Sequence, residues 1–156
     1  MKQKITSCLL GMGLLAAAGL AYSADRFSYS SDGSEVTDNT TGLVWRRCAE
    51  GMTWNGSICT VSASTYTHEG ALLRAQTQTG WRLPNVKELS SLVDRSRSYP
   101  AIDPTAFPNT PSDIFWTSSP YVGSSSYAWH VYFNSGGVYG SGGDRNDGYY
   151  YVRLVR

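Results

Sequence analysis

The chain has few charged residues and no concentrated basic or acidic stretch. Asp, Glu, Lys and Arg make up 16% of its 156 residues, with 13 basic and 12 acidic side chains. A nucleic-acid-binding surface needs Lys and Arg gathered on one face, so this class of partner is excluded. Aromatic residues reach 13%. A chain with little charge and many aromatic residues has the composition of a folded domain.

Side chains for metal binding and nucleophilic catalysis are scarce. Neither of the two histidines, His68 and His130, lies near a second metal-ligating residue at a recognisable spacing. The Gly-rich stretch NSGGVYGSGGD lacks the G-x-x-x-x-G-K-[ST] spacing of a phosphate-binding loop. We therefore expect no catalytic residues, no metal site and no cofactor. A structural calcium ion at Asp144, Asn146 and Asp147 stays open as an alternative, although the EF-hand pattern is absent.

Only the first residues contain a hydrophobic run. Lys2 and Lys4 precede the stretch CLLGMGLLAAAGLA, which ends in small residues. This arrangement is typical of a secretory signal peptide, and the run is too short to span a membrane. We predict a signal peptide over residues 1–23 and one domain over residues 24–156. A buried N-terminal helix is the alternative. The exported protein is expected to be periplasmic, secreted or at the cell surface, without a transmembrane segment.

Three cysteines are present, and Cys8 falls within the predicted signal peptide. The remaining two, Cys48 and Cys59, enclose the ten residues AEGMTWNGSI. An even pair in an exported chain predicts a local disulfide. By the loop-closure estimate it stabilises the fold by roughly 2–3 kcal/mol. A zinc site is the alternative, but no histidine pair lies nearby to complete it.

Turn signals and apolar spacing predict short strands and two helices. Asp32-Gly33 and the stretch TDNTTG are typical turns. Apolar side chains near helical spacing predict a first helix within residues 64–79. In WRLPNVKELSSLVDR, Pro84 suits a first helical turn, which predicts a second helix. The strands expected around the turns are Phe27–Ser30, Glu35–Val36 and Leu43–Arg46.

The C-terminal residues alternate with the period of two that strands require. A disordered tail would not keep this period, so we predict that the tail is folded. In YAWHVYF, one face carries Trp129, Val131 and Phe133, and the other carries Ala128, His130 and Tyr132. In YYYVRLVR, one face carries Tyr150, Val152 and Leu154, and the other carries Tyr149, Tyr151, Arg153 and Val155.

Four stretches, VTDNTTGLVWRRC, WRLPNVKELSSLVD, FWTSSP and YVRLVR, occur in this order. They resemble the family of the C-terminal domain of bacterial Lcl collagen-like adhesins, over the whole chain after the predicted signal peptide. The resemblance implies an α+β, C-type lectin-like fold with two helices, a small twisted antiparallel sheet and long loops. Members are exported or displayed at the surface, and the adhesin is associated with binding of sulfated glycosaminoglycans.

The tail also resembles the variable region of proteins diversified by retroelements, in which template adenines are randomised. From Tyr121 to Tyr151 most positions hold Tyr, Ser, Gly, Asn, Asp or His, the residues reached from an Asn codon by changing its adenines. This resemblance implies a contiguous ligand-binding surface over a fixed apolar frame. The expected contact residues, which Gly137 and Gly148 extend, are Ser124, Ser125, Ser126, Tyr127, His130, Tyr132, Ser135, Tyr139, Asp144, Asn146, Asp147, Tyr149 and Tyr150.

The residue types of this surface favour binding without catalysis. Tyr supplies a large contact area with few rotatable bonds, and Ser, Gly and Asn adapt their hydrogen bonds to a partner, as in antibody paratopes. We predict a ligand-binding or adhesion module whose partner is a protein or glycan on another cell or surface. One alternative is a glycosaminoglycan-type adhesin without diversification, and another is a structural subunit of a surface assembly. A formylglycine-generating enzyme is disfavoured, because Cys48 and Cys59 lie in a short local loop.

Overall fold

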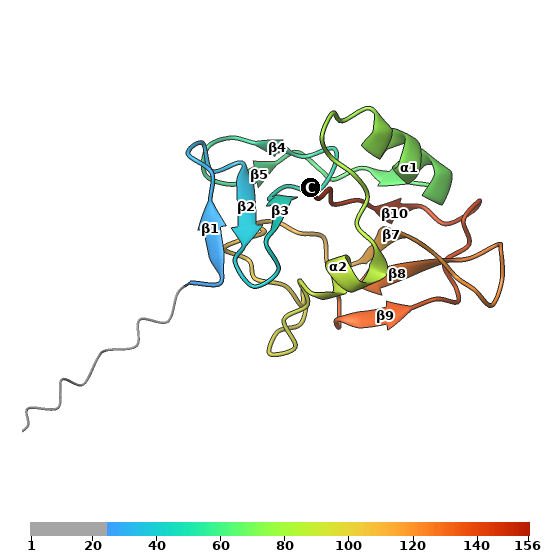
Figure 1. Ribbon diagram of the computed structural model, residues 1–156. Helices are drawn as coiled ribbons and strands as arrows, with labels where there is room; N and C mark the ends of the chain where they lie inside the picture. Colours follow the sequence, from blue (N-terminus) through green and yellow to red (C-terminus); the bar gives the residue numbers. More distant parts are fainter. Residues whose placement is uncertain (1–24) are drawn as a thin grey trace, which may run out of the picture.

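The computed structural model describes residues 25–156 (Figure 1). The predicted signal peptide lies outside the described residues. Within residues 25–156, no helix has the length and apolar character needed to cross a membrane. The described part of the chain holds two helices and three sheets. The prediction of an α+β class with two helices is confirmed.

The first three strands form an antiparallel sheet on the left of Figure 1. The first turn closes because the Asp32 carboxylate accepts hydrogen bonds from the hydroxyls of Ser30 and Ser34, each at 2.7 Å. Gly42 ends the second turn with a φ of 74°, a conformation that glycine adopts without strain. The strands, which lie close to their predicted ranges, are β1 (Phe27–Tyr29), β2 (Glu35–Asp38) and β3 (Leu43–Arg46).

A small hairpin follows, made of β4 (Thr53–Trp54) and β5 (Cys59–Thr60). A disulfide joins Cys48 to Cys59, as predicted. Both cysteines are buried, so the bond fixes the hairpin to the interior of the domain.

The first helix, α1 (His68–Gln76), is shorter than the predicted span of residues 64–79. It begins late because Thr67 is its N-cap, with a side-chain oxygen that accepts a hydrogen bond from the backbone N–H of Gly70 at 3.1 Å. The residues just before the cap form strand β6 (Thr65–Tyr66) instead.

The second helix, α2 (Val86–Ser90), begins with a capping box. The Asn85 side chain accepts from the backbone N–H of Glu88 at 3.0 Å, and the Glu88 carboxylate accepts from the backbone N–H of Asn85 at 2.8 Å. Arg82 adds two hydrogen bonds to the same carboxylate, both at 2.7 Å. The sequence predicts Pro84 in the first turn of this helix, but Pro84 precedes the N-cap Asn85 and lies outside the helix.

The largest sheet has the strand order β6-β10-β7-β8-β9 and lies on the right of Figure 1. Its pairs are antiparallel except that β10 runs parallel to β7. The predicted antiparallel pairing thus holds for most of the sheet, and the parallel pair was not expected. The new strands are β7 (Ile114–Pro120), β8 (Ala128–Tyr132), β9 (Gly137–Tyr139) and β10 (Tyr150–Tyr151).

Both faces of this sheet are covered. Helix α2 packs on β7 and β8, and α1 packs on β6 and β7. The two helices contribute to different buried clusters, so they lie against opposite faces. The cluster on the α2 side includes Leu89, Leu92, Phe115, Val131 and Phe133. The cluster on the α1 side includes Ala71, Ala75, Trp116, Val152 and Leu154.

Arg153 is a fully buried cation in the C-terminal segment. Its guanidinium donates to the carbonyls of Arg46 and Arg47 and, at 2.7 Å, to the hydroxyl of Thr110, and it lies 4.7 Å from the ring centre of Phe107. Burial lowers the pKa of Arg153 to about 9, so the side chain is still protonated at neutral pH. Among residues 25–156 no carboxylate pairs with it. Arg153 therefore ties the C-terminal segment to the end of β3 and to Thr110 through carbonyl and hydroxyl oxygens.

Candidate functional site

Strand β8 keeps the predicted alternation, but residues on both of its faces are sheltered. Val131 and Phe133 are fully buried, as expected for frame residues. His130 is only 4% exposed, against the expectation that it lies at the surface. The chain folds back over this face, so that a side chain at Gly143 would come within 2.6 Å of the His130 ring. His130 is thus part of the frame.

Three predicted contact residues, Tyr132, Tyr139 and Tyr150, lie on the same face of the sheet as His130; we call them the tyrosine patch. The register of β8 and β9 places Tyr139 opposite His130. The His130 ring centre lies 5.9 Å from that of Tyr139 and 5.7 Å from that of Tyr150. Tyr139 is 48% exposed, whereas Tyr132 and Tyr150 are half-buried. The rings of Tyr139 and Tyr150 are therefore held by His130 and remain partly open to solvent.

Two C-terminal loops, residues 121–127 and 141–149, lie side by side at one end of the sheet. Tyr127 and Asp144 form an isolated antiparallel bridge between them. The backbone N–H of Arg145 donates to the carbonyl of Ser126 at 2.9 Å. Pairing of this kind brings two stretches of predicted contact residues, separated by β8 and β9 in the sequence, onto one surface.

A polar groove of about 280 Å³ separates these loops from α1. Ser125 and Asn146, both exposed, line it from the loops together with Arg145, and Glu69 and Leu72 line it from α1. The groove has an acidic and a basic side chain, an amide and a hydroxyl around one space. This combination suits a ligand that offers both donors and acceptors.

Apart from His130, the predicted contact residues are exposed or half-buried. Ser135 stands apart from the two loops, in the turn that joins β8 to β9. The exposed ones are Ser125, Ser126, Ser135, Tyr139, Asn146, Asp147 and Tyr149. The half-buried ones are Ser124, Tyr127, Tyr132, Asp144 and Tyr150.

Close packing leaves little room for side chains at some glycines of the tail. A side chain at Gly148 would approach the backbone carbonyl of Asp144 to 2.6 Å, and one at Gly140 would approach the Tyr121 ring to 2.2 Å. The hypothesis that Gly148 extends the variable set therefore conflicts with its packing. Glycine is required there because no other residue fits without moving the loop.

In the tyrosine patch, the pKa of Tyr150 lies above its ordinary value. Burial raises its pKa, and the negative charges of Asp113 and Asp144 raise it further. Its hydroxyl donates to the carbonyl of Gly142 at 3.2 Å. Tyr150 therefore stays neutral and holds the second loop against the sheet.

Of the residues considered for calcium binding, Asp144 is engaged within its own loop. The Asp144 carboxylate accepts a hydrogen bond from the backbone N–H of Asn146 at 2.9 Å, and Asp147 is exposed. In the described part of the chain, no group of three or more His, Cys, Asp or Glu side chains is placed to hold a metal ion.

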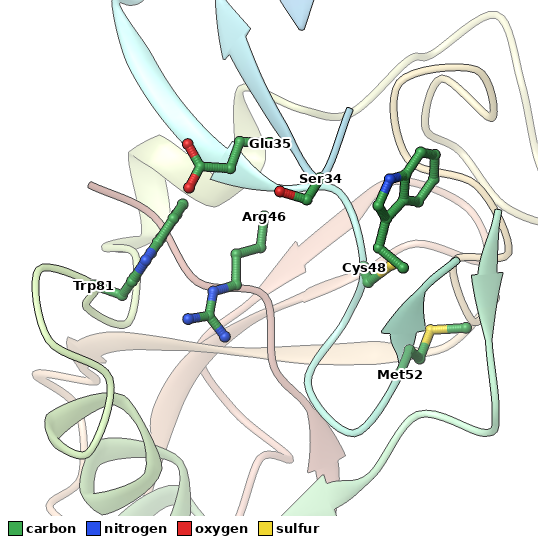
Figure 2. Close-up of a pocket in the computed structure, with 7 residues that line it drawn as sticks. Ser34, Glu35, Arg46, Cys48, Met52 and Trp81 are labelled. Carbon is green, nitrogen blue, oxygen red and sulfur yellow. The ribbon is translucent and has the colours of Figure 1, made fainter. Parts of the chain in front are cut away.

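A second hollow, of about 260 Å³, lies at the end of the first sheet. Figure 2 shows Trp81 on one side of it, Cys48 and Met52 on the other, and Arg46 between them. The Arg46 guanidinium stacks 4.9 Å from the Trp81 ring centre and donates to Glu50 and Gln78. These polar groups are engaged within the domain, which indicates a structural role. This cluster could not be predicted from the sequence because Trp81 meets Arg46 only through tertiary packing.

The chain folds as an α+β domain, in which helices cover both faces of the largest sheet and two polar loops pair at one end of it. The chain belongs to the Lcl C-terminal domain family, which matches residues 34–156. This match confirms the resemblance that the four sequence stretches indicate. The chain has no significant match among curated proteins or solved structures.

Proposed function

We propose that this domain is an exported ligand-binding or adhesion module with a C-type lectin-like arrangement, and that it performs no catalysis. Its contact surface comprises the tyrosine patch and the two C-terminal loops, including the groove beside α1. The disulfide supports export, because such bonds form and persist in oxidising compartments.

One observation carries the proposal: two stretches of predicted contact residues, in loops 121–127 and 141–149, pair at one end of a sheet whose frame residues Val131 and Phe133 are buried. Tyr149 is 65% exposed and Tyr139 is 48% exposed, while Val131 and Phe133 of the frame are fully buried. Large aromatic side chains left in water on a rigid support are typical of binding hot spots. We further propose that a retroelement has diversified this surface, since replacements at exposed positions leave the frame intact.

A cell-binding assay tests the function. The fluorescently labelled exported protein is applied to intact bacterial and animal cells, beside the double variant Tyr139→Ala/Tyr149→Ala. We expect the variant to lose at least tenfold in binding with an unchanged melting temperature. The matched control is Tyr99→Ala, which removes a tyrosine 74% exposed outside the surface. Equal binding by the double variant and the control would refute the proposal.

Three further tests separate the alternatives. Retention on heparin-agarose at physiological salt, unaffected by the tyrosine substitutions, would favour a glycosaminoglycan-type adhesin. Dissociation of an oligomer by the same substitutions, seen by light scattering, would favour a subunit of a surface assembly. A reverse transcriptase gene beside a near-copy of the 3′ end of this gene, differing at template adenines, would establish diversification, and its absence would leave an undiversified domain.

A further inference from the structure

His68 and Arg145 join the second C-terminal loop to the start of α1. His68 is 1% exposed and is the first residue of the helix. Its backbone N–H donates to the carbonyl of Arg145 at 3.1 Å. Its ring nitrogen Nδ1 accepts a hydrogen bond from Nε of Arg145, also at 3.1 Å. The two contacts link residues 77 positions apart.

The hydrogen bonds require a neutral imidazole. The other ring nitrogen, Nε2, lies 2.9 Å from the carbonyl oxygen of Thr117. A carbonyl only accepts, so Nε2 carries the proton and Nδ1 is left free to accept from Arg145. Both ring nitrogens are satisfied in this one form.

Arg145 in turn holds the first C-terminal loop. Its backbone N–H bonds the carbonyl of Ser126 at 2.9 Å, and its guanidinium reaches the carbonyl of Ser125 at 3.4 Å. One arginine therefore connects α1 with both loops.

We propose that His68 and Arg145 form an acid-sensitive latch that holds the two C-terminal loops together at neutral pH and releases residues 141–149 in acid. Protonation would place an N–H on Nδ1, facing the Nε–H of Arg145, so the hydrogen bond would be lost. It would also bring two positive charges together in a buried site.

Among residues 25–156, no carboxylate forms an ion pair with His68 that would compensate the added charge. Burial lowers the pKa of His68, and the positive charge of Arg145 lowers it further, against the opposing effect of the Thr117 carbonyl. The helix N-terminus also disfavours a cation. Thr117 and Trp116 of β7 are uncharged. Among residues 25–156 neither Glu69 of α1 nor the acidic residues of loop 141–149, Asp144 and Asp147, form an ion pair with His68.

The latch itself does not depend on the proposed function, but its consequence for binding does. If the loops form the contact surface, their release removes the ordering that binding needs, and affinity falls in acid. The partner would then be held at neutral pH and released in an acidic compartment or microenvironment.

An NMR titration of the exported, ¹⁵N-labelled protein from pH 7.5 to pH 4 tests the latch without any ligand. We expect the His68 ring nitrogens to titrate below pH 6.5, its ordinary value. The amides of Arg145, Asn146 and Gly148 should shift with the same midpoint. Loop amides that stay unchanged while His68 titrates would overturn the proposal.

Three variants make the assignment specific. His68→Gln keeps a donor and an acceptor but does not titrate, so the loop response should vanish. His130→Gln is the matched control: it removes the other buried histidine and should leave the response at the His68 midpoint. Arg145→Gln removes the neighbouring cation and should raise the His68 midpoint, which tests the contact even if His68→Gln does not fold. A loop response that persists in His68→Gln, or a midpoint unmoved by Arg145→Gln, would refute the latch.

Discussion

The separation of frame from surface predicts a large loss of stability on replacing one aromatic residue of the tail and a small change on replacing another. Phe133 is fully buried and packs edge-on against Phe115 with 5.2 Å between ring centres. Tyr149 is 65% exposed. Replacement of Phe133 by Ala leaves a cavity, whereas replacement of Tyr149 by Ala removes atoms that solvent already surrounds.

The magnitudes differ by several-fold. Truncation of a buried Phe to Ala costs about 3–5 kcal/mol, since the transfer and cavity contributions add. Surface substitutions usually stay within about 0.5 kcal/mol. For a domain of this size each kcal/mol lowers the melting temperature by roughly 3–5 °C. Phe133→Ala should therefore melt roughly 10–20 °C lower, and Tyr149→Ala within a few degrees of the unaltered protein.

Urea unfolding followed by tryptophan fluorescence measures both effects, because Trp45 and Trp116 are buried and report on the core. Phe133→Leu is the control for volume, and we expect it to cost less than about 1.5 kcal/mol. A loss of more than about 2 kcal/mol in Tyr149→Ala would show that the surface is part of the frame. That result would remove the physical basis for a variable face.

Further predictions concern the elements that fix the scaffold. Replacement of Cys48 and Cys59 by Ser should lower the free energy of unfolding by roughly 2–3 kcal/mol in urea titrations, by loop-closure entropy; an unchanged midpoint would contradict this. Asn85→Ala should cost about 1 kcal/mol through loss of the capping box, and Asn85→Asp should restore most of it. Hydrogen bonds from Arg82 lower the pKa of Glu88 below its ordinary 4.5. The stability that this interaction adds is present above pH 4.5 and lost as pH falls through the lower, folded-state pKa. Urea titrations between pH 6 and pH 3 should therefore show a smaller acid loss in Glu88→Gln, and identical pH profiles would contradict the assignment.

Local features of the fold could be predicted from the sequence. The strands around Asp32-Gly33 and TDNTTG follow from turn residues that bond their own backbone, and the disulfide follows from an isolated cysteine pair. Helix α1 begins later than its apolar spacing predicts because Thr65 and Tyr66 pair with β10 in the sheet. Tertiary pairing overrides local preference in such short segments.

The candidate site could be predicted less completely because exposure depends on what covers each face. Alternation correctly separates Val131 from His130, but it cannot show that the chain returns over the His130 side. The hydrogen bond between His68 and Arg145 could not be predicted from the sequence either, because tertiary packing brings these two distant segments together. The exposed residues Ser125, Asn146 and Tyr149 were identified from composition alone, and their role in binding stays a prediction.

The position of β10 has a consequence for how the chain matures. This strand is formed by residues 150–151, yet it lies inside the sheet between β6 and β7, and Val152, Leu154 and Val155 that follow it are fully buried. A nascent chain lacking these residues leaves two strand edges and both hydrophobic clusters open. Complete folding must therefore wait until residues 150–155 are available.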